Sequence, residues 1–122
     1  MKKLLLLISI SFISFHIFSQ KVPTLSDKNE IIEAAKKEFE TSMQEEGVLK
    51  LYATEHNIKG EYYFDITVGD KKRVVTVFAI GNDSDDIKAQ NSLKDFLKAY
   101  EFSSFKVPKD KRYKYEQTFY FE

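Results

Sequence analysis

The segment from Gly60 to Gly81, GEYYFDITVGDKKRVVTVFAIG, constrains the fold of this chain most strongly, because it contains two strand-like stretches joined by a polar turn. From Glu61 to Val68, apolar and polar side chains alternate with the period of two expected for a half-buried strand. The stretch from Val74 to Ile80 is rich in β-branched and aromatic residues, and the five residues GDKKR lie between the two. The segment therefore predicts a β-hairpin, which needs further strands or helices over its apolar face to be stable.

A helix is expected on the N-terminal side of this hairpin. Asp27, followed three residues later by Glu30, has the spacing of a helix N-cap, and apolar residues then recur at helical spacing. These features predict an amphipathic helix over residues 27–46, which Gly47 is expected to end or bend. Residues 48–57 follow as a second piece, helical or irregular.

Another helix is expected after the hairpin. Ser84 or Asp85 can cap it, and acidic side chains stand where the helix dipole favours negative charge. Within residues 87–101, the apolar side chains fall on one face and form a stripe that would cover the hairpin. The stripe consists of Ala89, Leu93, Phe96, Leu97 and Tyr100.

Residues 112–122 predict a third strand, because apolar and polar side chains alternate again along them. One face carries Tyr113, Tyr115, Gln117, Phe119 and Phe121. The preceding helix carries the chain back along the sheet, and a right-handed crossover then places the last strand beside the first. The predicted fold class is therefore α+β: a two-layer sandwich in which helices pack on a three-stranded antiparallel sheet of order 2-1-3.

The start of the chain predicts a secretory signal peptide over residues 1–19. Two lysines precede an apolar stretch that runs to Phe18, the small Ser19 follows, and the first acidic residue is Asp27. The stretch is shorter than the roughly 20 residues that span a bilayer, so cleavage is favoured over a retained membrane anchor. We therefore expect a single domain over residues 20–122, exported to the periplasm or secreted, with no stable membrane anchor after cleavage.

Charge and cysteine content exclude some classes of protein. The whole chain has 19 basic and 19 acidic residues, and removal of the two N-terminal lysines leaves a net charge of about −2. Such a near-neutral domain lacks the concentrated basic surface of a nucleic-acid-binding protein, so no nucleic-acid partner is expected. The chain contains no cysteine, so the exported domain must be stable without disulfides.

Four short motifs between Leu49 and Glu122 occur in an order that is typical of one protein family. They are Ile58-Lys59-Gly60, the charged turn Asp70 to Arg73, the helix end Tyr100-Glu101-Phe102, and the closing segment from Val107-Pro108 to Phe121. This order resembles the TonB C-terminal domain, the periplasmic module of Gram-negative energy transducers that engages outer-membrane transporters. The resemblance implies the same α+β fold and the binding of a partner at a strand edge.

The sequence departs from the pattern of a complete transducer of that family. Such a transducer has a membrane-spanning N-terminal helix and a long proline-rich spacer, whereas this chain has a signal-like start and only Pro23 and Pro108. The Tyr-Pro pair that often precedes the family domain is missing from the segment Glu55 to Asn57. We therefore expect strand-edge binding without energy transduction by this chain itself.

The principal hypothesis for function is that the C-terminal strand binds an extended peptide or an envelope protein by strand addition. An edge strand has unpaired backbone groups that such a partner could pair with. The candidate binding residues are Tyr113, Lys114, Tyr115, Gln117, Phe119 and Tyr120. Of these, Tyr113, Tyr115 and Tyr120 are expected to point outward and provide selectivity, and proline at Gln117 is expected to prevent binding.

Lysines that alternate with tyrosines near this strand could also bind bases, glycans or lipid headgroups. We interpret them instead as protection of a sheet edge, with Glu61 and Asp65 of the first strand offsetting their charge. Two other functions are possible. A small periplasmic hydrolase could use His56 with the loop 83–86, and exposed sheet edges could pair with each other in a structural homodimer.

No metal or cofactor is expected. Asp85-Asp86 lacks the alternating ligands, the glycine and the final glutamate of a calcium loop. The sequence also contains no histidine pair or cysteine cluster for zinc.

Overall fold

The structure is a computed structural model, and it describes residues 22–82 and 87–122. The predicted signal peptide and the loop 83–86 lie outside these residues. Within the described part of the chain, no helix has the length and apolar character needed to cross a bilayer. The elements are α2 (Lys28–Ser42), α3 (Val48–Glu55), β1 (Gly60–Gly69), β2 (Arg73–Asn82), α4 (Ile87–Ala99) and β3 (Tyr113–Phe121).

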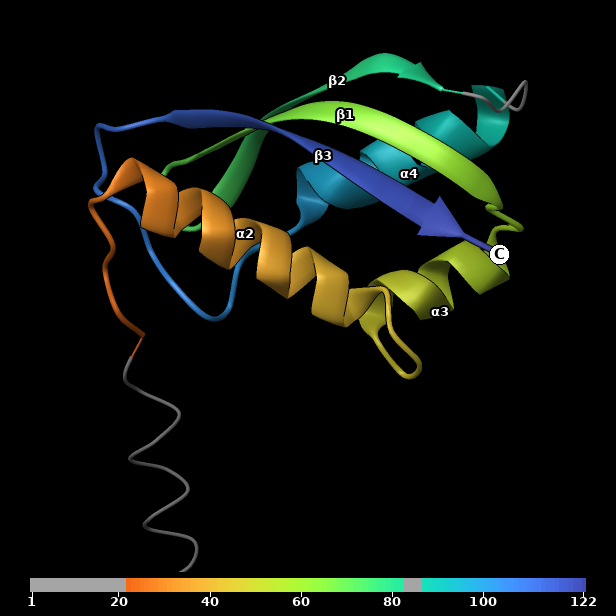
Figure 1. Ribbon diagram of the computed structural model, residues 1–122, viewed down its shortest axis with the longest axis horizontal. Helices are drawn as coiled ribbons and strands as arrows, with labels where there is room; N and C mark the ends of the chain where they lie inside the picture. Colours follow the sequence, from red (N-terminus) through yellow and green to blue (C-terminus); the bar gives the residue numbers. More distant parts are fainter. Residues whose placement is uncertain (1–21, 83–86) are drawn as a thin grey trace, which may run out of the picture.

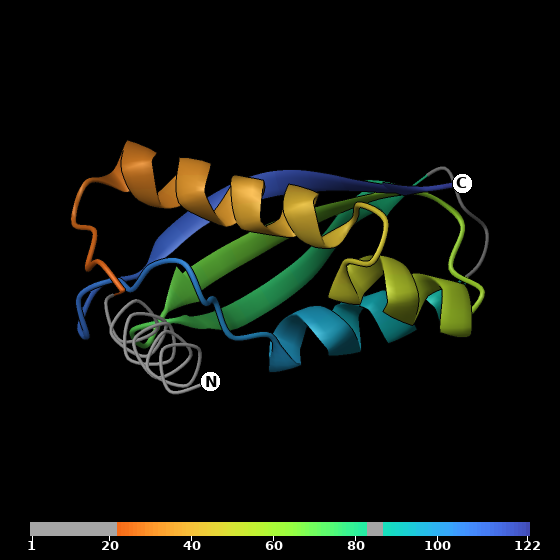
Figure 2. The same cartoon turned by 90° about the horizontal axis from the view of Figure 1, so that it is seen from below.

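The three strands form one antiparallel sheet in the order β2-β1-β3. The helices α2, α3 and α4 lie on one side of it, and no described helix covers the other side (Figures 1 and 2). α4 packs under β2, while α2 packs against β3 and α3. The α+β fold and the strand order predicted from the sequence are thus confirmed.

The central strand β1 pairs differently with its two neighbours. Its register with β3 is regular over nine consecutive pairs, from Gly60 opposite Phe121 to Val68 opposite Tyr113. Its register with β2 shifts at two places, between Tyr63 and Phe64 and between Thr67 and Val68. Bulges of this kind increase the local twist of the bulged strand and are common at sheet edges. β3 is therefore the more regular of the two outer strands.

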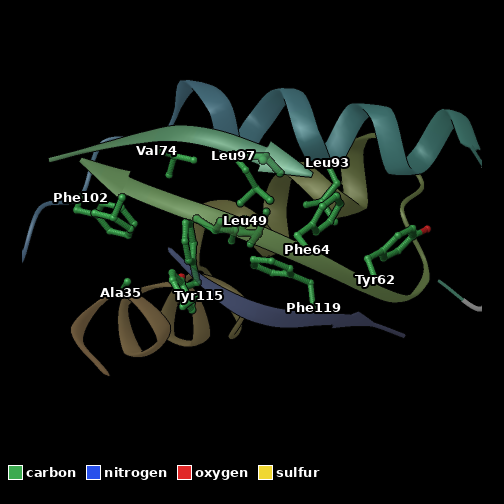
Figure 3. Close-up of a cluster of buried hydrophobic side chains, with 14 of the residues drawn as sticks. Ala35, Leu49, Tyr62, Phe64, Val74, Leu93, Leu97, Phe102, Tyr115 and Phe119 are labelled. Carbon is green, nitrogen blue, oxygen red and sulfur yellow. The ribbon is translucent and has the colours of Figure 1, made fainter. Parts of the chain in front are cut away.

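The core lies between the sheet and the helices. Side chains from α2, α3, α4, all three strands and the segment after α4 meet there, as Figure 3 shows. Alternate residues of β1 are fully buried, namely Tyr62, Phe64, Ile66 and Val68. The predicted stripe on α4 is buried at Ala89, Leu93 and Leu97, whereas Phe96 and Tyr100 are only half-buried and lie at the margin of the core.

The helix predicted over residues 27–46 is shorter than expected. Its N-cap is confirmed, because the Asp27 carboxylate accepts a hydrogen bond from the Glu30 backbone N–H at 3.1 Å. The helix ends at Ser42, however, and the chain turns through Glu46, whose φ of 69° lies in the left-handed region. Gly47 then starts α3 as its N-cap residue.

Candidate functional site

The predicted binding strand lies at one edge of the sheet. Within the described residues, β3 pairs with β1 on one side and with no strand on the other. Its backbone is extended throughout, and no bulge interrupts its pairing with β1. Such a regular edge presents a row of N–H and C=O groups that a further strand could pair with.

The side chains of the predicted site divide between the two faces of the sheet. Tyr115, Gln117 and Phe119 face the core and are buried. Tyr113 is half-buried and packs at the margin of the same core. The expectation that Tyr113 and Tyr115 point outward is therefore wrong, because the strict alternation of β3 places both on the inner face with Gln117. Lys114 and Tyr120 are on the outer face, where Tyr120 is 60% exposed.

Gln117 is a polar residue on the buried face of β3, and its amide is satisfied there. Its Oε1 accepts a hydrogen bond from the Tyr115 hydroxyl at 2.6 Å, and its Nε2 donates to the backbone oxygen of Lys36 in α2 at 3.5 Å. Burial raises the pKa of Tyr115 well above its ordinary value. The pair joins β3 to α2, and a proline at Gln117 would disturb this packing as well as the strand edge.

The charges on the outer face are partly paired across the ladder. Lys114 Nζ lies 3.6 Å from the Asp65 carboxylate of β1, as expected from the sequence. Both partners contact solvent, and an ion pair of this kind contributes little to stability. It helps to fix the lysine on the outer face, next to the free edge of β3.

The opposite edge of the sheet is less open. Arg73, at the start of β2, forms a backbone bridge with Glu101, and the Phe102 backbone N–H donates to the Lys72 carbonyl at 2.8 Å. β2 also contains the two register shifts. It exposes Phe78 by 58% on its outer face, so exposed aromatic area alone does not distinguish the two edges.

His56, the residue on which the hydrolase hypothesis depends, stands at the C-cap of α3. Its ring stacks on Tyr52 with the ring centres 4.0 Å apart, and its Nδ1 lies 3.0 Å from the Tyr52 backbone oxygen. The loop 83–86 lies outside the described residues. Within residues 22–82 and 87–122, no three His, Cys, Asp or Glu side chains group as metal ligands.

Two surface grooves were not predicted from the sequence. The larger, of about 650 Å³, runs beside α2 and contains Glu38, whose carboxylate accepts hydrogen bonds from the Tyr100 hydroxyl and from Ser103 and Ser104. Burial and the hydrogen bond to Glu38 raise the pKa of Tyr100. The second groove lies between α3 and α4. Both grooves form between segments that are distant in sequence. Helical periodicity, which is a local pattern, therefore cannot predict them.

In comparisons with known proteins, the chain matched no family model, no curated protein and no solved structure.

Proposed function

We propose that this protein is a small exported interaction module of the bacterial envelope, which binds an extended peptide segment by strand addition at the free edge of β3. The observation that supports the proposal is the regular nine-pair register of β3 with β1, next to an edge without a strand among the described residues. Backbone hydrogen bonds would provide affinity, and alternate side chains would provide selectivity.

The outer face of β3 indicates what a bound segment would contact. Lys114, Glu116, Thr118 and Tyr120 are exposed there at every second position. A strand added beside them would place its own outward side chains opposite or diagonal to these residues, where opposite charges and aromatic pairs stabilise a sheet. Selectivity is therefore assigned to the two charged residues and to Tyr120, in place of Tyr113 and Tyr115.

Export and an envelope partner follow from the expected signal peptide and from the resemblance to the TonB C-terminal domain. In that family the module engages a membrane transporter, and strand-edge binding is the feature that we carry over to this chain. Energy transduction is not part of the proposal.

Hydrogen exchange can test the proposed edge. We would select peptides from a random display library on the protein, synthesise the strongest binder and follow backbone amide exchange by NMR. Since added strands protect outward-facing amides, alternate amides between Tyr113 and Phe121 should exchange at least about tenfold more slowly when the peptide is bound. Protection of β2 instead, or of neither strand, would contradict the proposal.

A matched pair of substitutions tests the side-chain contribution. Tyr120 and Phe78 are aromatic, similarly exposed at 60% and 58%, and placed on opposite edge strands. Tyr120→Ala should weaken peptide binding by about fivefold, because it removes a cross-strand neighbour. Phe78→Ala should leave binding unchanged. Equal effects of the two substitutions on peptide binding would contradict the proposal that the peptide binds at β3.

The homodimer alternative uses the same free edge. Its dependence on protein concentration distinguishes it from peptide binding. If β3 pairs with a second copy of the chain, sedimentation will show a dimer without peptide, and the β3 amides will become protected as the protein concentration rises. Under the peptide hypothesis, the free protein stays monomeric and these amides exchange rapidly at every concentration.

A further inference from the structure

A shallow groove of about 470 Å³ lies between α3 and the C-terminal half of α4. Its lining consists of Tyr52, Asp95, Phe96, Ala99, Tyr100 and Glu101. Its lining residues come from α3, α4 and the two residues that follow α4, and none of them belongs to β3. It is therefore a second surface, separate from the one proposed above.

Three aromatic rings form a continuous row along this groove. The ring centres of Tyr52 and Phe96 are 4.8 Å apart, and those of Phe96 and Tyr100 are 6.0 Å apart. All three side chains are half-buried, so part of each remains accessible, and the stacked His56 ring covers one face of Tyr52. Two of them are held by hydrogen bonds: the Tyr52 hydroxyl donates to the Ser92 backbone oxygen at 2.8 Å, and the Tyr100 hydroxyl donates to Glu38. The rings are thus fixed before any ligand arrives.

Two exposed carboxylates, Asp95 and Glu101, flank the rings, and no lysine or arginine is among the lining residues. Among the described residues, the one ion pair joins Lys114 to Asp65. Neither Asp95 nor Glu101 therefore forms an ion pair there. Burial raises the pKa of Tyr52, and the negative charges of Asp95 and Glu55 raise it further. Asp95 and Glu55 thus place negative charge near the Tyr52 ring.

We propose that this groove binds a cationic side chain, preferably the guanidinium of an arginine, presented by a peptide segment of a partner protein. Aromatic faces attract a cation through their quadrupole, and a guanidinium can stack on a ring while it donates two hydrogen bonds to a carboxylate. The groove combines both kinds of group. A lysine ammonium would meet the same charges but has no flat face to stack on the rings.

A side chain of a polypeptide fits the groove better than a free organic cation. Asp95 and Glu101 are exposed, and the groove they line is shallow and open to solvent along the surface. A free ligand would be enclosed on few sides, whereas a peptide can remain outside and insert one side chain between the rings and the acids.

The probe is the tripeptide acetyl-Gly-Arg-Gly-amide, titrated into the protein while the ring resonances of Tyr52, Phe96 and Tyr100 are followed by NMR. The matched peptide carries citrulline, which keeps the shape of arginine and removes its charge. We expect saturable shifts at the three rings, with citrulline binding at least about fivefold more weakly. Sodium chloride should weaken the arginine peptide, because salt screens exposed charges. Equal shifts with both peptides, or shifts elsewhere, would overturn the proposal.

Charge-removing substitutions of similar shape locate the binding. The double variant Asp95→Asn and Glu101→Gln should bind the arginine peptide at least about fivefold more weakly. The control is the double variant Glu33→Gln and Asp110→Asn, which alters two exposed acids outside the groove and should bind like the original protein. An unchanged affinity in the groove variant would reject the site. Amide spectra establish that both variants are folded.

The source of the cation is tested with methylguanidinium, which carries the same charged group without a peptide. If the peptide is the occupant, methylguanidinium will bind more weakly than the arginine tripeptide. Equal or tighter binding of the free cation would overturn the assignment to a peptide side chain. None of these measurements depends on the edge of β3, so failure here leaves the strand-addition proposal untouched.

Discussion

Glu38 connects two parts of the molecule that are more than sixty residues apart in sequence. Its carboxylate accepts hydrogen bonds from the Tyr100 hydroxyl and from the backbone N–H groups of Ser103 and Ser104. These bonds hold the segment that follows α4 against α2. A charged acceptor makes each of them stronger than a bond between neutral groups.

Removal of this carboxylate should therefore destabilise the fold. We expect Glu38→Ala to lower the free energy of unfolding by about 2 to 3 kcal/mol, because several donors lose a charged acceptor at once. Urea denaturation measures the change. Glu40→Ala, at an exposed position two residues further along α2, should change the free energy by less than about 0.5 kcal/mol. Similar values for the two variants would show that the Glu38 network carries no stability.

At this scale the sequence predicts local contacts and misses distant ones. The cap between Asp27 and Glu30 was predicted and is confirmed, because a carboxylate three residues before a free N–H is a local pattern. The role of Glu38 could not be predicted in this way, because its hydrogen-bond donors are more than sixty residues away in the sequence. The period of two puts Tyr115 on the same face as Phe119, which is fully buried, so an outward Tyr115 conflicts with the alternation of the strand itself.

Gly47 determines how α2 joins α3. Its φ of −72° is available to any residue, so the requirement for glycine is one of space. A Cβ atom at this position would lie 2.2 Å from the backbone oxygen of Ser42. Backbone atoms cannot move aside without changing the angle between the two helices.

We therefore expect Gly47→Ala to destabilise the protein by about 1 to 3 kcal/mol, the usual range for overpacking. Gly69→Ala is the milder control, because the nearest contacts of the added Cβ would be side-chain atoms of Arg112 and Val75 at 3.1 Å and the Lys111 backbone oxygen at 3.3 Å, all well beyond 2.2 Å. Denaturation midpoints compare the two. A smaller loss of stability for Gly47→Ala than for Gly69→Ala would contradict the close contact between residue 47 and the Ser42 backbone.

The strands were predicted more accurately than the ends of the helices. Alternation over Glu61 to Val68 marks a half-buried strand directly, and β1 spans Gly60–Gly69. The end of α2 depends on the tight turn before Gly47, which periodicity does not report. In the hairpin, the residues with positive φ are Asp70 and Lys71, at 48° and 73°, and not Gly69, although glycine adopts such values most readily.

For the whole molecule, the order of the sheet followed from the sequence because the handedness of crossovers leaves one arrangement for a strand after a helix. The free edge of β3 followed from that order. The groove between α3 and α4 could not be predicted in the same way. Tyr52 and Phe96 are spaced like core residues, and only the packing of two helices brings them to a surface with acids beside them.

The stability of the whole molecule should fall in alkaline solution. Burial raises the pKa of Tyr115 in the folded state, whereas tyrosines of the unfolded chain lose their protons near pH 10. Below pH 10 Tyr115 is protonated in both the folded and the unfolded state, so its full contribution to the free energy of unfolding is present. Above this pH only the unfolded state releases the proton, so this residue should lower the free energy of unfolding by about 1.4 kcal/mol per pH unit.

Urea denaturation between pH 7 and pH 11 measures this dependence. The variant Tyr115→Phe should be less stable at neutral pH, since Gln117 loses a hydrogen-bond donor, but its stability should fall less steeply above pH 10. The slopes of the two proteins should agree between pH 7 and pH 9. Parallel curves over the whole range would show that Tyr115 is not responsible.

The unbroken register between β1 and β3 decides where this chain can change its length. One residue inserted within β3 would reverse the facing of everything beyond it, turning Phe119 and Phe121 to solvent. The exposed turn at Lys109 and Asp110, which precedes the strand, can absorb the same insertion because no ladder passes through it. We therefore expect insertions to be tolerated in the turn before β3 and not within β3 itself.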